Sequence, residues 1–396
     1  MNYLKQNTEK LFQLCSEGIR SGGGGYWLPI KQISVPLTNK CNNYCIMCHA
    51  CDKSYENHTY YNGTPFELSL KKFKHLLPMP KRTLKEKICG IVKTSEDEIE
   101  FVFGSAESLL SSQCYEIFRY IKTIYPNSRI RIISNGTIPP KPLDIVKYID
   151  RIGFSVDGCT KETYEYLRTP AKFDHAIKTI RQWDETASEY NDKFSFGFGI
   201  VLSSRNIREF AGIVQLAAEF KHIDSVYVQP IILYESLSHL ENLLLNKVDP
   251  ADLEKHIEEA KEVSKNTGVR IDGLDSLASI IGGNHTDSDK EDSSLADFSK
   301  YCRYMWNGIL NLNDEGKLRY LCCYMTQEMA DKLMSVYDLP TSGSIGDIYN
   351  SKEFWTLRRD MLEGKLTEYC VKCNLCNAGY EKLKSAELDM DENFYL

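Results

Sequence analysis

Six short apolar segments alternate with helical patterns between residues 31 and 235, and this alternation limits the fold of the 396-residue chain more than any other feature. Strands that alternate with helices build βαβ units around a parallel sheet. Six units are too few for a closed eight-stranded barrel, so the pattern predicts an α/β fold with a partial (β/α)6 TIM-like barrel. The expected strands are Ile33–Leu37, Ile99–Phe103, Ile130–Ile133, Ile152–Val156, Phe194–Val201 and Val226–Ile231, and the expected helices include Ser108–Tyr125, Lys161–Asp184 and Ile207–Lys221.

Three cysteines follow directly on the first expected strand. Cys41, Cys45 and Cys48 have the spacing C-x3-C-x2-C, which brings three thiolates to one point when it lies on a loop. A [4Fe–4S] cluster normally takes four thiolates, so three leave one iron open to a ligand from outside the protein. Zinc stays open as an alternative, because His49 or Cys51 can supply a fourth ligand. A disulfide framework fits poorly, because such frameworks belong to small secreted chains.

Composition describes an ordinary globular protein, with 42% hydrophobic and 26% charged residues. The net charge of -7 does not indicate a large basic surface for binding nucleic acid. No apolar run approaches the ~20 residues of a membrane span. The first residues lack the apolar core of a signal peptide, so we expect a cytoplasmic protein with no membrane or nucleic-acid partner. In a reducing compartment, the 14 cysteines favour metal ligation over disulfides.

The cysteine loop resembles that of the radical SAM enzymes, in which the open iron binds the amino and carboxylate groups of S-adenosylmethionine (SAM). This resemblance implies that Cys41, Cys45 and Cys48 hold the catalytic cluster, and that the partial barrel is the radical SAM core. The function it implies is reductive cleavage of SAM to a 5′-deoxyadenosyl radical, which abstracts hydrogen from a substrate C–H bond. The electron comes from an external donor, a flavodoxin or ferredoxin.

Candidate SAM-binding residues lie where expected strands end, which is where parallel α/β folds place ligand sites. Gly104 and Glu107 follow the second strand, where the family carries a Gly-Gly-Glu-like turn that binds the SAM amino group. Ser105 and Ala106 depart from that pattern. Asn135 ends the third strand, at the place of a similar Thr-Asn-Gly-like segment in the family. The alternatives are a helix-start carboxylate for Glu107 and a tight Asn-Gly turn for Asn135.

The fourth strand and the helix after it supply three further candidates. Ser155 and Asp157 point to the same side of a strand of period two, where a hydroxyl and a carboxylate can hold SAM. Arg168 follows and can pair with the SAM carboxylate. In relatives with this Ser-x-Asp-Gly run, the serine and an arginine at about this distance contact SAM. Taken singly, a turn-forming Asp157 and a solvated Arg168 are credible alternatives. No catalytic acid or base is assigned.

A second group of cysteines lies near the C-terminus and resembles the SPASM or twitch auxiliary-cluster extension of radical SAM enzymes. No cysteine follows the last of this group, Cys376, which favours one auxiliary [4Fe–4S] cluster over two. A structural zinc is the alternative, because cysteine spacing does not identify the metal. The expected ligands are Cys302, Cys322, Cys370 and Cys373, with Cys323 and Cys376 as spare or alternative ligands.

The chain thus divides into an N-terminal extension (1–30), a radical SAM core (31–240), a helical connector and linker (241–295) and a small α+β auxiliary-cluster domain (296–396). We expect an oxidoreductase or maturase with two [4Fe–4S] clusters and SAM, in which the auxiliary cluster takes part in net oxidation. The expected reaction is modification or cross-linking of peptide or protein side chains. The alternatives are dehydrogenation of a sugar-like or aminocyclitol alcohol, which is a small-molecule substrate, and a non-catalytic iron–sulfur redox sensor. Residues 1–30 are too short for a separate leader-peptide-binding domain, which weakens the peptide case.

Overall fold

The computed structural model describes residues 12–13, 15–20, 30–48, 66–77, 99–104, 106–231, 235–274, 277, 309–312, 318–320 and 345–363. The chain divides into two compact units. The first, here the barrel unit, consists of Ser34–Phe73 and Glu100–His285. The second unit consists of Met1–Ile33, Lys74–Ile99 and Thr286–Leu396. The domain boundaries expected from the sequence stay predictions.

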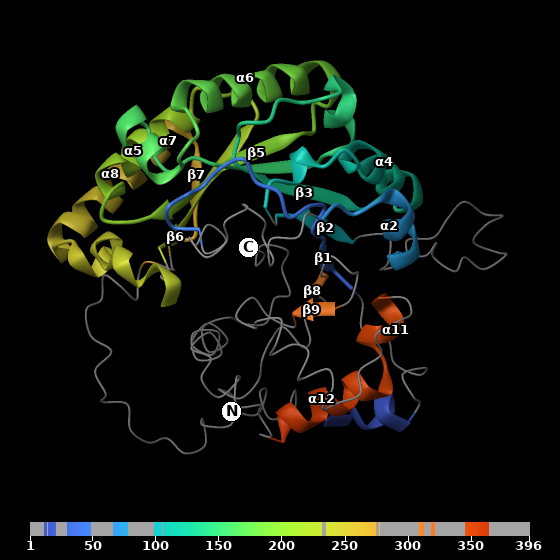
Figure 1. Ribbon diagram of the computed structural model, residues 1–396. Helices are drawn as coiled ribbons and strands as arrows, with labels where there is room; N and C mark the ends of the chain where they lie inside the picture. Colours follow the sequence, from blue (N-terminus) through green and yellow to red (C-terminus); the bar gives the residue numbers. More distant parts are fainter. Residues whose placement is uncertain are drawn as a thin grey trace. The chain divides into compact units, whose positions relative to one another are not determined.

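A parallel sheet forms the centre of the barrel unit and confirms the α/β, partial-barrel fold class (Figure 1). The strand order is β7-β6-β5-β4-β3-β2-β1, as expected where each crossover adds a strand beside the last. The strands are β1 (Gln32–Ser34), β2 (Glu100–Phe103), β3 (Arg129–Ser134), β4 (Arg151–Ser155), β5 (Ser195–Leu202), β6 (Ile223–Pro230) and β7 (Arg270–Asp272).

Two details differ from the sequence expectation. The strand β7 lies in the stretch expected to be a helical connector. The sequence did not predict it, because it has only three residues and two of them are charged. The expected helix Lys161–Asp184 is two helices, α5 (Lys161–Leu167) and α6 (Phe173–Tyr190). Pro170 lies between them, and proline disfavours helical geometry both at its own position and at the residue before it.

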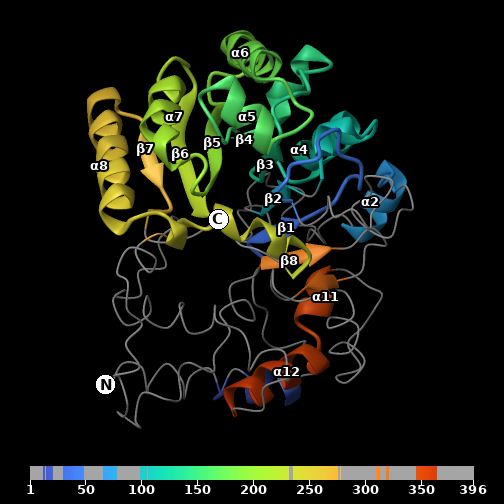
Figure 2. The ribbon, with the colours of Figure 1, turned by 60° about the vertical axis from the view of Figure 1, so that its left-hand side comes forward.

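Helices cover one face of the sheet, as the two ribbon views show (Figures 1 and 2). They are α5 and α6 together with α4 (Cys114–Ile124), α7 (Phe210–Ala217) and α8 (Pro250–Thr267). The helix α8 begins at a capping Asp249 and ends at Gly268, whose φ of 79° suits glycine. Shorter elements are α2 (Leu70–Leu76), η3 (Ser108–Leu110), η4 (Leu143–Tyr148), η5 (Ile207–Glu209), η6 (Glu235–Leu243) and η7 (Leu245–Lys247).

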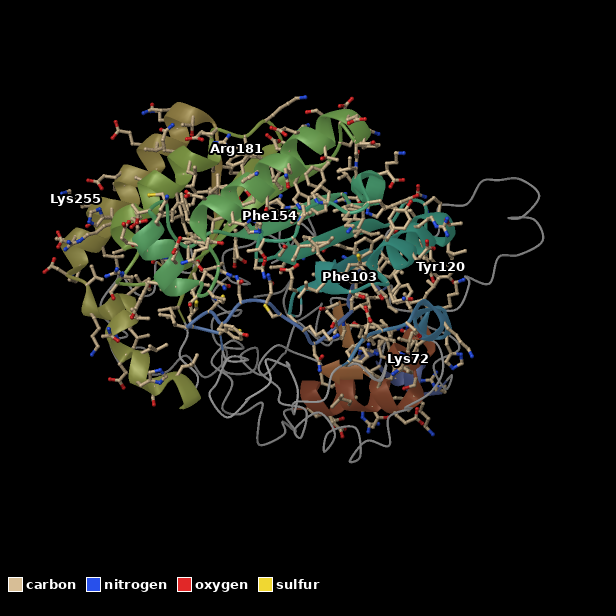
Figure 3. All side chains as sticks on the ribbon, turned by 45° about the horizontal axis from the view of Figure 1, so that its top comes forward. Lys72, Phe103, Tyr120, Phe154, Arg181 and Lys255 are labelled. Carbon is tan, nitrogen blue, oxygen red and sulfur yellow. The ribbon has the colours of Figure 1, made fainter. Side chains whose placement is uncertain are left out.

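Aromatic side chains fill the layer between the sheet and these helices. Phe103 packs on Phe118 of α4 with ring centroids 4.9 Å apart, and Phe154 packs on Trp183 of α6 at 6.3 Å (Figure 3). Because side chains alternate along a strand, the neighbours of Phe154, which are Gly153 and Ser155, lie on the opposite face. We call this opposite face, across β3 to β6, the inner face of the sheet.

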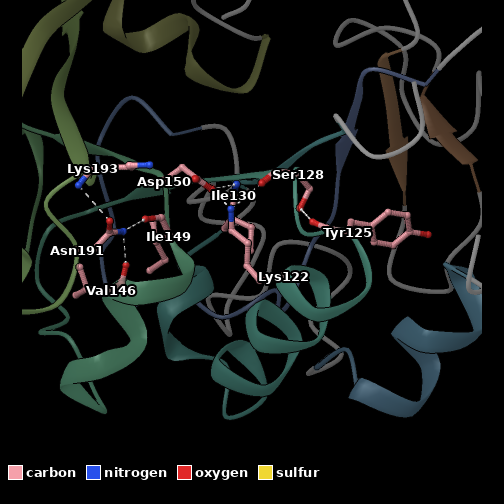
Figure 4. A network of polar contacts seen from close by, with 9 residues as sticks. All are labelled: Lys122, Tyr125, Ser128, Ile130, Val146, Ile149, Asp150, Asn191 and Lys193. Atoms are coloured by element: carbon pink, nitrogen blue, oxygen red, sulfur yellow. Dashed lines mark hydrogen bonds and ion pairs between the residues drawn. The ribbon is translucent and has the colours of Figure 1, made fainter. Parts of the chain in front are cut away.

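Polar contacts hold the sheet at the end where its strands begin. Asp150 accepts hydrogen bonds from the Ile130 N–H and the Lys122 ammonium group, both at 2.6 Å (Figure 4). Asn191 donates to the carbonyl groups of Val146 and Ile149 at 3.0 and 3.1 Å. These bonds connect the segments before β4 and β5 to each other and to α4. The candidate functional residues lie at the opposite end of the sheet, where the strands end.

A charged contact crosses the inner face near the same end. The Arg151 guanidinium reaches from β4 over β5 to β6, where it pairs with Asp224 and donates to the Ser225 hydroxyl at 3.0 Å. It passes over Gly197, where an added Cβ would lie 2.6 Å from Arg151 Nη2. Glycine at this position therefore gives the arginine its path across the middle strand.

The described part of the second unit contains an antiparallel hairpin of β8 (Ile309–Leu312) and β9 (Leu318–Tyr320), and the helices α11 (Ile345–Tyr349) and α12 (Lys352–Leu362). The buried Arg358 guanidinium lies 4.4–4.5 Å from the ring centroids of Tyr349, Phe354 and Trp355, as in cation–π packing. Among all described helices, none has the length and apolar character that crossing a bilayer requires.

Candidate metal centre

The three loop cysteines follow β1 and lie within electrostatic reach of one another. Cys45 is buried, with 8% of its surface exposed, while Cys41 and Cys48 are half-buried. Burial raises the pKa of the Cys45 thiol to about 12, the nearby Arg168 charge opposes this rise, and the negative charges of Cys48 and Cys41 add to it. Such mutual repulsion between thiolates is relieved when they bind a cationic metal centre.

Backbone hydrogen bonds hold this loop in place. Tyr44 N–H donates to the Thr169 carbonyl at 2.5 Å, and Ile46 N–H donates to the Leu167 carbonyl at 3.1 Å. On the other side, Glu107 N–H donates to the Lys40 carbonyl at 3.0 Å. The loop therefore lies between the end of α5 and the turn after β2. Hydrogen bonds from these two segments help to fix its backbone conformation.

The turn after β3 binds the loop through side chains. Asn135 Nδ2 donates to Asn42 Oδ1 at 2.7 Å and lies 3.9 Å from Cys41 Sγ. Asn42 Nδ2 in turn donates to the Thr137 hydroxyl at 2.8 Å. Thr137 closes the set by donating to Asn135 Oδ1 through its hydroxyl (2.6 Å) and its N–H (3.0 Å). Gly136, with φ of 75°, makes the turn between them.

Glu107 lies fully buried beside this turn. Its carboxylate accepts hydrogen bonds from the Ser134 hydroxyl at 3.1 Å, the Asn135 N–H at 2.7 Å and the Leu109 N–H at 3.3 Å. Burial nevertheless raises its pKa to about 7, because loss of solvent outweighs these donors. Gly104 directly follows β2, and Ser105 lies outside the described residues. Ala106 has φ of 51°, the left-handed region that favours glycine.

Asp157 and Arg168 form a buried ion pair next to the loop. The Asp157 carboxylate has no exposed surface and accepts from Arg168 Nε and from Val201 N–H, at 2.5 and 2.6 Å. Arg168 Nη1 also reaches Cys45 Sγ at 3.7 Å. Asn206 supports the pair by donating to the Asp157 carbonyl at 2.9 Å. The arginine is therefore fixed by a carboxylate on one side and points a donor at a loop sulfur on the other.

Ser155 lies apart from this network, on the inner face at the end of β4. It is half-buried, and its hydroxyl has no hydrogen bond to any residue that the structure describes. Its neighbour in register on β5 is Gly199, which has no side chain to cover it. Of the sequence candidates, Glu107, Asn135, Asp157 and Arg168 thus form hydrogen bonds around the loop, whereas the Ser155 hydroxyl forms none with the described residues.

Sequence reasoning missed the residues that support these candidates. Asn42 lies between the cysteines and Thr137 lies two residues after Asn135, yet nothing in the sequence pairs them. Tyr164 is another omission: it is fully buried on α5, and the charges of Arg168, Asp157 and Cys45 all act on its hydroxyl. Tyr164 lies four residues before Arg168, a spacing that places both on one helix face, and this spacing could have identified Tyr164 from the sequence.

The chemistry of the donor set at this loop suits an iron–sulfur cluster. Three thiols stand on one segment, and amide and guanidinium donors lie at two of the sulfurs, as cluster-binding loops require. Within the part of the chain that the structure describes, which includes these three cysteines, no three Cys, His, Asp or Glu side chains lie in an arrangement that could hold a metal ion as they stand. The cysteines expected to hold the auxiliary cluster lie outside the described residues; they are Cys302, Cys322, Cys323, Cys370, Cys373 and Cys376.

The chain is similar to known proteins in both sequence and structure. A family model described as "Radical SAM superfamily" matches residues 35–217. SuiB from Streptococcus suis, bound to S-adenosylmethionine, is similar with a TM-score of 0.54 and 12% identity, over 88% of this chain and 71% of that one. Its complex with the precursor peptide SuiA gives a TM-score of 0.52 and 13% identity, over 84% and 67%.

A further similar structure is native anSMEcpe with bound AdoMet and Cp18Cys peptide, with a TM-score of 0.50 and 16% identity over 86% of both chains. No curated protein matches the sequence. Identities this low show a shared fold.

Proposed function

We propose that the chain is a radical SAM enzyme that cleaves SAM reductively and oxidises a C–H bond of its substrate, because residues 35–217 match the Radical SAM superfamily model. The observation that carries this proposal is the clamped loop of Cys41, Cys45 and Cys48, with the Arg168 guanidinium at one sulfur. When bound, a [4Fe–4S] cluster and SAM supply a 5′-deoxyadenosyl radical that abstracts hydrogen from the substrate.

The chain's own residues divide the work of holding these groups. Cys41, Cys45 and Cys48 would hold the cluster by three thiolates, which would leave a coordination position for SAM. Ser155, whose hydroxyl has no partner among the described residues, and Gly104, directly after β2, would contact SAM. Glu107 and Asn135 hold the loop through the bonds described above, and Asp157 orients Arg168 toward loop and ligand. A sensor without SAM needs no such set, which favours the enzyme.

We propose a peptide or protein side chain as the substrate. The support is the two similar folds seen with bound peptides, SuiB with SuiA and anSMEcpe with the Cp18Cys peptide. The proposal includes an auxiliary [4Fe–4S] cluster, which Cys302, Cys322, Cys370 and Cys373 would hold and which would supply an acceptor for the electron left on the substrate. It also includes a flavodoxin or ferredoxin as electron donor, in the cytoplasm.

The test is SAM cleavage by protein reconstituted with iron and sulfide under anaerobic conditions. With dithionite as reductant, we expect 5′-deoxyadenosine by mass spectrometry from the wild type. None is expected from the variant with Cys41, Cys45 and Cys48 all changed to Ala. The matched control is Cys114→Ala, which removes a buried thiol on α4 and should retain activity. Continued 5′-deoxyadenosine formation by the triple variant would refute the assignment.

A further inference from the structure

Two arginines lie side by side on the inner face of the sheet. Arg131 of β3 and Arg151 of β4 are partners in register, so their side chains leave adjacent strands at the same level and on the same face. Like charges at such neighbouring positions destabilise a sheet. Arg131 pairs with Glu100 of β2, and Arg151 pairs with Asp224 of β6. The two carboxylates therefore lie on the outer sides of the pair of arginines.

Arg131 has hydrogen-bond donors that the described residues do not use. Only 9% of its surface is exposed, and burying a charge costs free energy unless its donors are bonded. Its Nη2 donates to the Glu100 carboxylate at 3.1 Å. Its Nε is buried, and neither Nε nor Nη1 has a hydrogen-bond partner in the part of the chain that the structure describes. These two donors are therefore available to an anionic group.

The inner face next to this arginine carries little side-chain cover. Ile133, two residues further along β3, is on the same face and is 40% exposed, and its partner in register is Gly153. A Cβ added at Gly153 would meet only the Ile132 carbonyl oxygen within 4 Å among the described residues, at 3.9 Å. One added at Gly199 would meet only the Phe154 carbonyl oxygen, also at 3.9 Å. We call Ile133, Gly153 and Gly199 the apolar floor, because an apolar group can lie on them.

We propose that Arg131 binds a carboxylate of the substrate while an apolar part of the substrate lies on the apolar floor, so that the enzyme selects peptides with an acidic group. The inference rests on the proposed function, since it places the substrate beside Ser155, a residue proposed to contact SAM. Along the strands, the level of Arg131 and that of Ser155 differ by four residues, or roughly 13 Å, and the apolar floor lies between the two levels.

A carboxylate suits this position for two reasons. A guanidinium donates to a carboxylate through a charge-assisted hydrogen bond, and Arg131 has two donors to offer. A negative charge beside Arg131 also offsets its repulsion with Arg151, the neighbour in register. The carboxylate can belong to an acidic side chain or to the C-terminus of a peptide, and the chemistry of recognition is the same. Arg131 is thus a specificity-determining residue of the proposed reaction.

The test is the binding of blocked amino acids to the full-length, reconstituted protein, kept oxidised and saturated with SAM so that no turnover occurs. Ligand-observed saturation-transfer NMR compares N-acetylglutamate α-amide, which has a side-chain carboxylate, with its neutral counterpart N-acetylglutamine α-amide. N-acetylalanine tests a C-terminal carboxylate in the same way. We expect at least one carboxylate probe to bind roughly tenfold more tightly than the neutral probe, as a charge-assisted hydrogen bond would give.

Three variants locate the site. Arg131→Lys keeps the positive charge but loses the planar set of donors, and it should lose most of the preference for the carboxylate. Arg119→Lys is the matched control, because Arg119 lies on α4 and pairs with Glu116 at the surface. Gly153→Val fills the space above the apolar floor, so it should abolish binding of the probes. Urea unfolding should show that all three variants are as stable as the wild type to within about 1 kcal/mol, which is tenfold or less in the unfolding equilibrium.

The outcomes separate this inference from the proposed function. A reconstituted wild type that forms no 5′-deoxyadenosine refutes the proposed function. A wild type that cleaves SAM but shows no difference between charged and neutral probes, including no binding of either, refutes the carboxylate site alone. The same preference in Arg131→Lys as in the wild type also refutes it, and so does a carboxylate probe that binds only without SAM. A preference that a folded Arg131→Lys variant loses and Arg119→Lys keeps supports the site.

Discussion

Replacing Gly197 with Ala should weaken the barrel unit, whereas the same change at Gly199, two residues along β5, should not. An added Cβ at Gly197 would lie 2.6 Å from Arg151 Nη2 and 2.8 Å from the Ser225 carbonyl oxygen. The carbonyl belongs to the β5–β6 ladder and cannot move without breaking it. At Gly199 the nearest atom is the Phe154 carbonyl oxygen at 3.9 Å, an ordinary contact.

The expected magnitude combines two costs at Gly197. Overpacking in a well-packed region costs about 1–3 kcal/mol. Displacing Arg151 weakens its bonds to Asp224 and Ser225, whose loss is discounted because the two charged side chains are 31% and 27% exposed. Together the free energy of unfolding should fall by about 2–4 kcal/mol. Gly199→Ala should be neutral or stabilise by about 0.5–1 kcal/mol, since alanine restricts the unfolded chain.

The assay is urea unfolding of both apoprotein variants, with hydrogen exchange of peptides from β4 to β6 to localise the effect. We expect faster exchange in these strands for Gly197→Ala alone. Arg151→Ala should cost less in the Gly197→Ala background than in the wild type, because both changes remove the same crossing contact. Equal shifts in the same direction for Gly197→Ala and Gly199→Ala would contradict the steric explanation.

Four other substitutions test the candidate site and the proposed auxiliary cluster. Asp157→Asn leaves the Arg168 charge buried without its carboxylate, so unfolding free energy should fall by about 3–5 kcal/mol in urea titrations, and unaltered stability would contradict the ion pair. The pKa of Glu107 is raised from 4.5 to about 7 by burial, so the folded state binds a proton more tightly and stability should fall as pH rises through this window. Glu107→Gln should remove that slope in unfolding measurements of the apoprotein, and an unchanged slope argues against it. Cys322→Ala should lower iron from about eight per chain and stop substrate turnover while SAM cleavage persists, whereas Cys323→Ala should keep the iron. Adjacent residues on a strand face opposite ways, so the reverse result means that the ligand register is off by one.

The strands of the barrel unit were largely predictable, because each is a short apolar run between turn signals. Ile130–Ile133 and Phe194–Val201 lie within or overlap the observed β3 and β5. The edge strand β7 was not predictable, since two of its three residues are charged and only pairing with β6 makes it a strand. Pro170 indicates a helix break, but the helical periodicity on both sides of it led to the prediction of one continuous helix.

The sequence predicted which residues lie at the candidate site, but it did not predict which hydrogen bonds each of them forms. The ends of the parallel strands gathered Glu107, Asn135 and Asp157 around the cysteine loop, as the fold requires. The sequence does not show that their polar atoms bond to one another and to the loop backbone. Long-range pairs such as Asn42 with Thr137, 95 residues apart, depend on how strands pack, which local patterns do not contain.

The contact between Arg168 and Cys45 joins residues 123 positions apart, and this separation has a consequence for synthesis. At about 5–20 residues per second, the ribosome releases the arginine roughly 6–25 seconds after the cysteine. For most of that interval the loop also lacks the clamp of Asn135, and throughout it the loop lacks the anchor at Thr169. The thiol that ends up buried is first exposed to oxidants, so the nascent chain is the stage at which this loop is most vulnerable to damage.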